Sequence, residues 1–387
     1  LDRVNVGFAK LDMLNDLGFS ETAYGLGAGT FFIGYFLFEV PSNIILHRVG
    51  ARIWIARIMI TWGVVSALFM FVRTPLQFYV LRFVLGLAEA GFFPGIILYL
   101  TYWYPSDRRA RMISLFMTAI PLSGILGGPV SGWIMQSMEG WHGWRGWQWL
   151  FLLEALPAVV LGLATFRSLD NGIRSAAWLT EDQKRLLESQ LDHDRAHVTA
   201  HPTLAAVFAD RRLWKMALIY FCCVIGQYGL TFWLPTLVQQ AGGVGALQIG
   251  FLTAIPYCGG VVAMILFGQS ADRWRERRWH LVAPMVMGAI GLSLSVLAGT
   301  QTTLAILCLT VAAGGILTCA PLFWSLPTAL LEGTAAAAGI AAINSVGNLS
   351  GFVSPYGIGW LKDVTHSTEA GMYAVSAVLV FGAGLVL

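Results

Sequence analysis

The chain of 387 residues is 57% hydrophobic and only 12% charged, and its formal net charge is +3. A soluble domain carries about 25% charged residues because water must wet its surface, so this composition argues against a soluble globular protein. Apolar runs of roughly 20 residues, the length that crosses the hydrocarbon core as a helix, recur along the chain. The strand alternation typical of an outer-membrane barrel is missing from these runs. We therefore predict an all-α membrane protein.

The apolar runs predict twelve transmembrane helices, arranged as six, a polar linker and six. The first six spans are expected near residues 1–10, 24–46, 53–71, 76–100, 112–137 and 148–167. The last six are expected near residues 213–238, 247–270, 280–298, 303–328, 335–361 and 370–387. The chain begins and ends inside apolar runs, so we expect the first and last helices to be truncated. These limits divide the chain into an N-terminal half (1–167), a linker (168–212) and a C-terminal half (213–387).

Basic residues gather on one side of the predicted spans. They are concentrated in the linker and in the turns after the second, fourth and eighth spans, whereas the first loop carries Asp12, Asp16 and Glu21. Cytoplasmic loops carry an excess of lysine and arginine, so we place the basic turns and the linker in the cytoplasm. Within the linker, Trp178–Leu191 is expected to form a short amphipathic helix, capped by Thr180, that lies along the inner membrane face.

Among the ionisable residues within the predicted spans, we single out Asp2, Arg3, Glu39, Arg82 and Glu89. A charge at the centre of a membrane helix costs about 2.5–3.5 kcal/mol on insertion scales, so each is expected to be paired or functional. Arg82 and Glu89 are seven residues apart, close to two helical turns, and should share one face of the fourth span. A polar face on an apolar membrane helix indicates that the helix lines a water-filled cavity.

These side chains have the chemistry of anion recognition and proton transfer. Arginine stays charged and can hold a carboxylate with two parallel hydrogen bonds, which makes Arg3 and Arg82 candidate anion-binding residues. A desolvated carboxylate can exchange a proton near neutral pH, which makes Asp2 and Glu89 candidate proton carriers. The alternative is that Asp2–Arg3 and Arg82–Glu89 are static ion pairs that brace the bundle. For Glu39, at the inner end of its span, a gating role is expected at least as readily as substrate contact.

Six uncharged polar or aromatic residues are further candidates for substrate binding. Hydroxyl, amide and indole groups can hydrogen-bond a hydroxy acid or stack on an aromatic acid, although the same groups also join membrane helices to one another. The candidates are Tyr35, Gln227, Tyr228, Trp324, Asn344 and Asn348. The C-terminal half has no arginine or lysine deep inside its predicted spans, so recognition of charge is expected from the first half.

Two turns at corresponding positions in the two halves resemble each other. His47–Arg52 follows the second span and Gly268–Arg273 follows the eighth, as a duplicated six-helix unit would place them. The second turn resembles the signature turn of the major facilitator superfamily, in which a glycine leads an Asp-Arg pair and basic residues follow. The first turn departs from that pattern, with histidine where aspartate is expected. The residues at these turns that we expect to act in gating are Arg48, Asp272 and Arg273.

Further segments narrow the resemblance. Gly124–Gly132 is similar to the glycine–proline motif of the superfamily's fifth helix. The resemblance to the anion:cation symporter family, closest to its phthalate and tartrate permease branch, is carried by Leu1–Asn5, Glu39–Asn43, Arg82–Ala90, Phe232–Pro235 and Asn344–Asn348. That family is related to hexonate transporters, sialin and the vesicular glutamate transporters. The resemblance covers essentially the whole chain and implies a twelve-helix bundle whose two six-helix halves are related by pseudo-two-fold symmetry.

The resemblance also implies a function. It indicates a secondary transporter, working as a monomer in the bacterial cytoplasmic membrane, that imports a tartrate-, hexarate- or phthalate-like carboxylate together with protons. In such transporters the first-helix Asp-Arg and the fourth-helix Arg and Glu take the roles assigned above, and Tyr35 and Asn344 contact the substrate. A uniporter or a drug or metabolite exporter of the same fold is the open alternative.

Other functional classes lack support in the sequence. The chain contains no His-Glu-x-x-His motif, no Gly-x-Ser-x-Gly motif and no phosphate-binding glycine loop, so we predict that it is not an enzyme and needs no cofactor or metal. The internal repeat favours alternating access over a channel. The expected partners are a small organic anion, protons and the lipid bilayer, and no nucleic acid.

Overall fold

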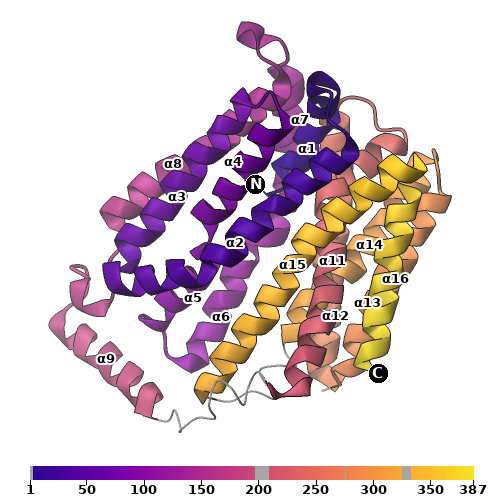
Figure 1. Cartoon of the computed structure of the whole chain (residues 1–387). Coiled ribbons are helices and arrows are strands. Elements are labelled where there is room, and N and C mark those ends of the chain that lie inside the picture. The colour runs from indigo at the N-terminus through magenta and orange to yellow at the C-terminus, as the bar shows by residue number, and fades with distance from the viewer. Residues whose placement is uncertain (1–2, 197–208, 275, 325–332) are drawn as a thin grey trace.

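The computed structural model describes residues 3–196, 209–274, 276–324 and 333–387, and its regular secondary structure in these ranges is helical (Figure 1). The first six spans are α1 (Asn5–Leu17), α2 (Glu21–Val49), α3 (Ala51–Leu68), α4 (Pro75–Glu89) continued by α5 (Phe92–Thr101), α6 (Ser106–Met117) continued by α7 (Ala119–Ser137), and α8 (Gly146–Ser168). The last six are α11 (Arg211–Gln240), α12 (Ala246–Trp274), α13 (Arg278–Leu297), α14 (Thr302–Trp324), α15 (Gly333–Thr365) and α16 (Glu369–Val386). The predicted twelve-helix bundle is confirmed.

Shorter elements connect these spans. Three single turns of 3₁₀-helix lie at Phe69–Phe71, Trp141–Gly143 and Ile173–Ser175. The predicted linker helix is present as α9 (Glu181–Ala196). Its start is a capping box, since Gln183 N donates to Thr180 Oγ1 at 3.3 Å and Thr180 N donates to Gln183 Oε1 at 3.0 Å. Trp178, just before the helix, stacks on Trp103 with 5.8 Å between ring centroids and so attaches the linker to the end of α5.

The fourth predicted span is one crossing made of two helices. The helix α4 ends at Glu89, and α5 begins at Phe92. Between them Gly91 has φ +86°, in the left-handed region that glycine adopts without strain. A Cβ at this position would also collide with the Ser42 hydroxyl of α2. The break places Glu89 at the carboxyl end of a helix in the middle of the crossing.

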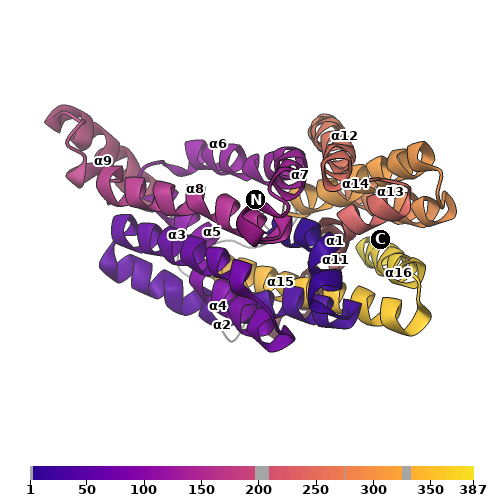
Figure 2. The ribbon, with the colours of Figure 1, turned by 90° about the horizontal axis from the view of Figure 1, so that it is seen from above.

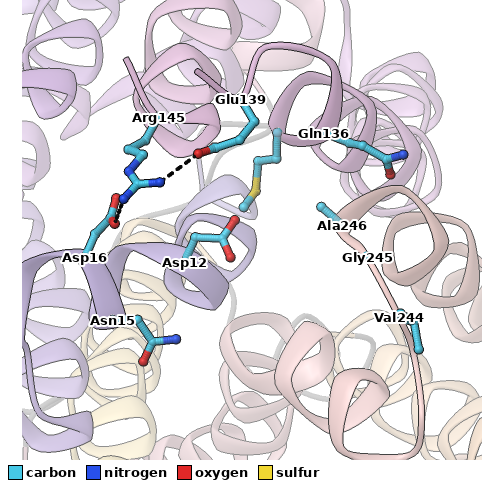
Figure 3. A pocket seen from close by; sticks show the side chains of 10 residues that line it. Asp12, Asn15, Asp16, Gln136, Glu139, Arg145, Val244, Gly245 and Ala246 are labelled. Carbon is cyan, nitrogen blue, oxygen red and sulfur yellow. Dashed lines mark hydrogen bonds and ion pairs between the residues drawn. The ribbon is translucent and has the colours of Figure 1, made fainter. Parts of the chain in front are cut away.

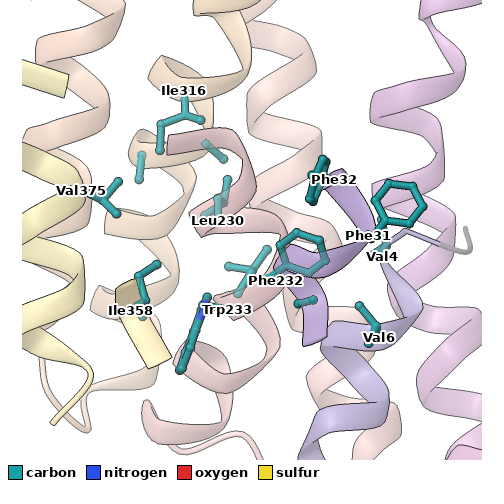
Figure 4. Packing of buried hydrophobic residues seen from close by; sticks show 14 of the residues in the cluster. Val4, Val6, Phe31, Phe32, Leu230, Phe232, Trp233, Ile316, Ile358 and Val375 are labelled. Atoms are coloured by element: carbon teal, nitrogen blue, oxygen red, sulfur yellow. The ribbon is translucent and has the colours of Figure 1, made fainter. Parts of the chain in front are cut away.

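The two sets of six spans lie side by side, and α15 runs along α2 and α11 at their junction (Figures 1 and 2). A second line of contact joins α7 to α12. At the centre, Val4 and Val6 pack close to Phe31 and Phe32 of α2 and to Phe232 of α11 (Figure 4). One apolar cluster therefore continues from the first half into the second.

Small residues set the distance between α7 and α12. A Cβ added to Gly128 would collide with the carbonyl oxygen of Gly250, and one added to Gly250 would collide with the carbonyl oxygen of Gly128. The two backbones therefore touch, as small residues permit between membrane helices.

Gly250→Ala is expected to lower the melting temperature of the purified protein. Overpacking a close contact costs about 1–3 kcal/mol, which exceeds the gain of about 1 kcal/mol in helix propensity from glycine to alanine. Gly384→Ala in α16 is the control, because its added Cβ meets no atom within 4 Å. Thermal unfolding in detergent compares the two variants with the wild type. A melting temperature of Gly250→Ala equal to or above that of the wild type would contradict the close contact.

Candidate functional site

An ion pair between Arg3 and Glu89 lies at the junction of α1, α2 and α4. Arg3 Nε donates to Glu89 Oε1 at 2.6 Å, and Arg3 Nη2 contacts the same oxygen. The guanidinium lies 5.3 Å from the ring centroids of both Phe31 and Tyr35 on α2. Some 39% of the Arg3 side chain is accessible, against 9% for Glu89. Arg3 is thus held by a buried carboxylate and two aromatic rings while part of its surface stays open.

Arg82 lies close to this pair but is bound differently. It is 2% exposed, and it donates from Nε to the Gly27 carbonyl at 3.4 Å and from Nη2 to the Ala28 carbonyl at 3.1 Å. Its guanidinium also lies 5.0 Å from the Phe31 ring centroid. Glu89 is therefore paired with Arg3 and not with Arg82, unlike the static pair considered from the sequence. The α2 carbonyls are within reach because α4 packs tightly on α2, where a Cβ on Gly86 would collide with the Phe31 carbonyl.

The C-terminal half adds amide and phenol groups to the same region. Asn344 Nδ2 of α15 donates to Glu39 Oε1 of α2 at 3.3 Å. Tyr228 OH of α11 donates to Asn348 Oδ1 of α15 at 3.3 Å. Tyr228 also packs edge-on against Phe32 of α2, with 4.4 Å between ring centroids. Side chains of the C-terminal half thus contact α2 close to the rings that hold Arg3, which was not deducible from their positions in the sequence.

The remaining predicted residues lie around or away from this group. Gln227 is partly exposed on α11, and Trp324 at the end of α14 packs edge-on against Tyr220 with 4.9 Å between ring centroids. Asp2 lies outside the described residues, so its role stays a prediction. The predicted gating residues at the ends of α2 and α12 that were assigned to the cytoplasmic side are all exposed, namely Arg48, Asp272 and Arg273.

A second charged group joins the halves on the side opposite the basic turns, here called the outer side. Lys10 of α1 is 3% exposed, and its Nζ lies 2.8 Å from Glu21 Oε2 and 3.2 Å from Thr236 Oγ1 of α11. The same ammonium lies 3.3 Å from the Trp233 ring centroid, a cation–π contact. Lys10 is not among the residues predicted from the sequence to be functional, although a lysine at the end of the first apolar run is a visible signal.

The C-terminal half completes this group from α15. Lys362 forms an ion pair with Glu21, so two lysines share one carboxylate. Asp363 accepts from Thr22 N at 2.7 Å and from Glu21 N at 3.3 Å, which caps the first turn of α2 from the other half. We call Lys10, Glu21, Trp233, Thr236, Lys362 and Asp363 the outer network. It holds α1 and α2 against α11 and α15 on the outer side.

A pocket of about 490 Å³ lies at the outer surface, between α1, the α7–α8 loop and the α11–α12 loop (Figure 3). It contains none of the predicted substrate-binding residues. Arg145 lies between Asp16 and Glu139, with N–O distances of 3.0 Å to each, and Asp12 adds a third carboxylate (Figure 3). Three carboxylates against one arginine give a negative lining that repels an anion. The candidate anion site is therefore the region around Arg3 and Glu89.

The sequence of the chain matches a known protein family and known relatives. The family model of the Major Facilitator Superfamily matches residues 1–355. A protein of Agrobacterium vitis named "Putative tartrate transporter" is 50% identical over 388 residues, which cover 100% of this chain and 86% of that protein. A "Quinolone resistance transporter" of Acinetobacter baumannii is 43% identical over 384 residues, covering 99% of this chain and 88% of that protein.

A solved structure shares the fold at much lower identity. A bacterial homologue of the human lysosomal transporter Spinster, in an inward-facing and unoccupied conformation, matches with a TM-score of 0.79 and 16% sequence identity. The match covers 100% of this chain and 92% of that one. The chain therefore belongs to the major facilitator superfamily of membrane transporters, and its relatives agree with the anion:cation symporter branch that its motifs indicate.

Proposed function

We propose that the protein is a secondary transporter that imports a small organic anion together with protons across the bacterial cytoplasmic membrane. The observation that carries the proposal is the Arg3–Glu89 pair, in which an arginine with 39% of its side chain accessible is held by one buried carboxylate. Arginine binds a carboxylate through two parallel N–H bonds. A substrate carboxylate competes with Glu89 for the same donors.

This competition supplies the proposed coupling. While Glu89 is ionised it occupies the Arg3 guanidinium, and a proton on Glu89 removes its charge and releases Arg3 for the substrate. Anion and proton therefore load together, which is what symport requires. Asp2 is proposed as a second proton carrier on the strength of its place beside Arg3 in the sequence. In this scheme Arg82 shapes the site by holding α2 against α4 and contributes positive charge from a buried position.

The substrate is proposed to be a tartrate-, hexarate- or phthalate-like carboxylate. The relative named for tartrate supports a hydroxy acid. The aromatic surroundings of Arg3, with Phe31 and Tyr35 beneath the guanidinium and Tyr228 nearby, would also suit an aromatic acid. The relative named for quinolone resistance supports export as the second candidate function. The direction of transport relative to the proton gradient separates import from export.

Alternating access is proposed to proceed by rocking of residues 1–167 against residues 213–387, with one chain containing the whole path. The outer network and the α7–α12 contact join the two halves, and they are proposed to keep the outer side closed. The Glu39–Asn344 hydrogen bond crosses between the halves beside Arg3, so Glu39 is proposed to respond to substrate binding. Arg48, Asp272 and Arg273 are proposed to act when the cytoplasmic side closes.

The test is uptake of radiolabelled tartrate and phthalate into proteoliposomes with and without an inward proton gradient. We expect gradient-driven accumulation in the wild type that rises as the external pH falls. Glu89→Gln should lose accumulation, because residue 89 no longer changes charge, yet keep counterflow exchange of the same substrate. Glu369→Gln, an exposed carboxylate at the start of α16, is the control. Accumulation that ignores both the gradient and Glu89→Gln would exclude proton symport.

A further inference from the structure

An arginine lies on the lipid-facing stripe of α3. The exposed apolar residues of this helix are Ile53, Val64 and Leu68, at 46%, 48% and 42% exposure. Arg57 follows Ile53 by four residues and precedes Val64 by seven, so at 3.6 residues per turn it projects from the same face. The buried residues Ile55, Ile58 and Gly63 lie on the other side of the helix. Arg57 therefore faces the membrane and not the Arg3 site.

The Arg57 guanidinium has an aromatic contact, and two of its three nitrogens lack an acceptor within the described part of the chain. Its Cζ lies 3.8 Å from the Trp54 ring centroid. Its Nε and Nη2 atoms are buried and have no hydrogen-bond partner among the residues that the structure describes. Arg52, five residues earlier, contrasts with it, because its Nε donates to the Phe166 carbonyl at 2.6 Å. The protein encloses these two nitrogens of Arg57 in this conformation, so the side chain must turn outward before it finds an acceptor. Hydrocarbon offers no water to a charged donor, so on this face of α3 the acceptor has to come from a lipid headgroup.

The direction of the side chain indicates which part of the lipid supplies that acceptor. Side chains on a helix lean toward its N-terminus, and the N-terminus of α3 follows the basic turn assigned to the cytoplasmic side. Trp54 lies one turn nearer that end, so the guanidinium extends over the indole toward the inner headgroups, as long basic side chains do. The indole is held in place, because Trp54 Nε1 donates to Ser42 Oγ at 3.0 Å. Tryptophan is also a residue of the membrane interface.

We infer that Arg57 and Trp54 bind the phosphate group of an inner-leaflet phospholipid, with an anionic lipid such as phosphatidylglycerol preferred. The phosphate oxygens provide acceptors for the guanidinium donors, and the acyl chains lie along the apolar stripe of α3. The preference for a lipid with net negative charge follows from Arg48, which is exposed in the last turn of α2. A soluble phosphate shares the headgroup chemistry but gains nothing from the apolar stripe.

The test compares thermal unfolding of delipidated protein in detergent before and after addition of phosphatidylglycerol. We expect the lipid to raise the melting temperature of the wild type by several degrees and to leave Arg57→Gln nearly unchanged. Without lipid, Arg57→Gln should melt at or above the wild type, because the variant no longer carries buried donors without acceptors. Arg73→Gln, an exposed arginine at the outer end of α3, should respond to lipid as the wild type does.

Native mass spectrometry supplies an independent measurement. At equal activation energy the wild type should retain one more phosphatidylglycerol than Arg57→Gln, and phosphatidylcholine should be retained less than phosphatidylglycerol. Trp54→Leu, which keeps the charge and removes the indole, should retain the lipid with several-fold lower occupancy. Equal stabilisation and equal retention in wild type and Arg57→Gln would overturn the site. Stabilisation by inorganic phosphate alone would overturn its assignment to a lipid.

Discussion

Arg3→Gln is expected to raise the half-saturation concentration for the transported anion about 10- to 100-fold. A hydrogen bond to a charged group is worth about 1.5–3 kcal/mol, and each 1.4 kcal/mol is about a tenfold change in affinity. We expect the largest loss of affinity at Arg3, because its guanidinium binds the Glu89 carboxylate and still has accessible surface for a carboxylate of the substrate. Initial rates of uptake over a range of anion concentrations measure the effect.

Two further variants show whether geometry or charge alone is responsible. Arg3→Lys keeps the positive charge but loses the planar pair of donors, so it should lie between the wild type and Arg3→Gln. Arg73→Gln removes an exposed arginine in the outer loop between α3 and α4 and should leave the half-saturation concentration unchanged. A wild-type half-saturation concentration in Arg3→Gln, at normal expression, would remove Arg3 from the substrate site.

Glu21→Gln is expected to open the outer side of the transporter. Glu21 is the carboxylate shared by Lys10 and Lys362, so its neutralisation leaves two ammonium groups without their common counter-charge. Breaking a buried ion pair by removal of one member costs about 3–5 kcal/mol, and the 20% exposure of the Glu21 side chain reduces that cost. A shift of tenfold or more toward outward-open molecules is expected, since about 1.4 kcal/mol suffices.

Spin labels on cysteines at positions 73 and 300, in a background without the five native cysteines, measure this opening. Both positions are exposed on outer loops of opposite halves. Glu21→Gln should add a longer-distance population, and Glu369→Gln should not. Lys362→Met should cause a smaller shift, because Glu21 still neutralises Lys10. The double variant Lys10→Met/Glu21→Gln should recover part of the closed population. Unchanged distances in all variants would show that other contacts close the outer side.

Hydrophobic length predicted the bundle because crossing the membrane is a local requirement. Each span needs about 20 apolar residues in sequence, so its presence can be deduced without knowledge of its neighbours. Hydrophobic length did not predict the break between α4 and α5, because an interrupted helix and a continuous helix can have equally apolar sequences. The signal was Gly91, whose left-handed conformation allows the chain to leave one helix and enter the next.

The choice of Arg3 and Glu89 as functional residues also came from a local argument, the cost of charge in an apolar run. Their pairing with each other could not be deduced in the same way, because they are 86 residues apart. Spacing along one helix instead suggested Arg82 as the neighbour of Glu89. In the structure the Arg82 donors reach α2 carbonyls, a contact that depends on how closely α2 and α4 approach.

The sequence alone determined the fold class, the number of spans, the family and the residue types at the candidate anion site. Each of these depends on composition, on hydrophobic length or on short motifs read in order. Tertiary structure alone decided which charges neutralise one another, Arg3 with Glu89 and Lys10 and Lys362 with Glu21, and that the Glu39 carboxylate accepts a hydrogen bond from Asn344. The physical reason is that ion pairs and hydrogen bonds act over a few ångströms in space, and residues on different helices reach that distance only after the helices pack.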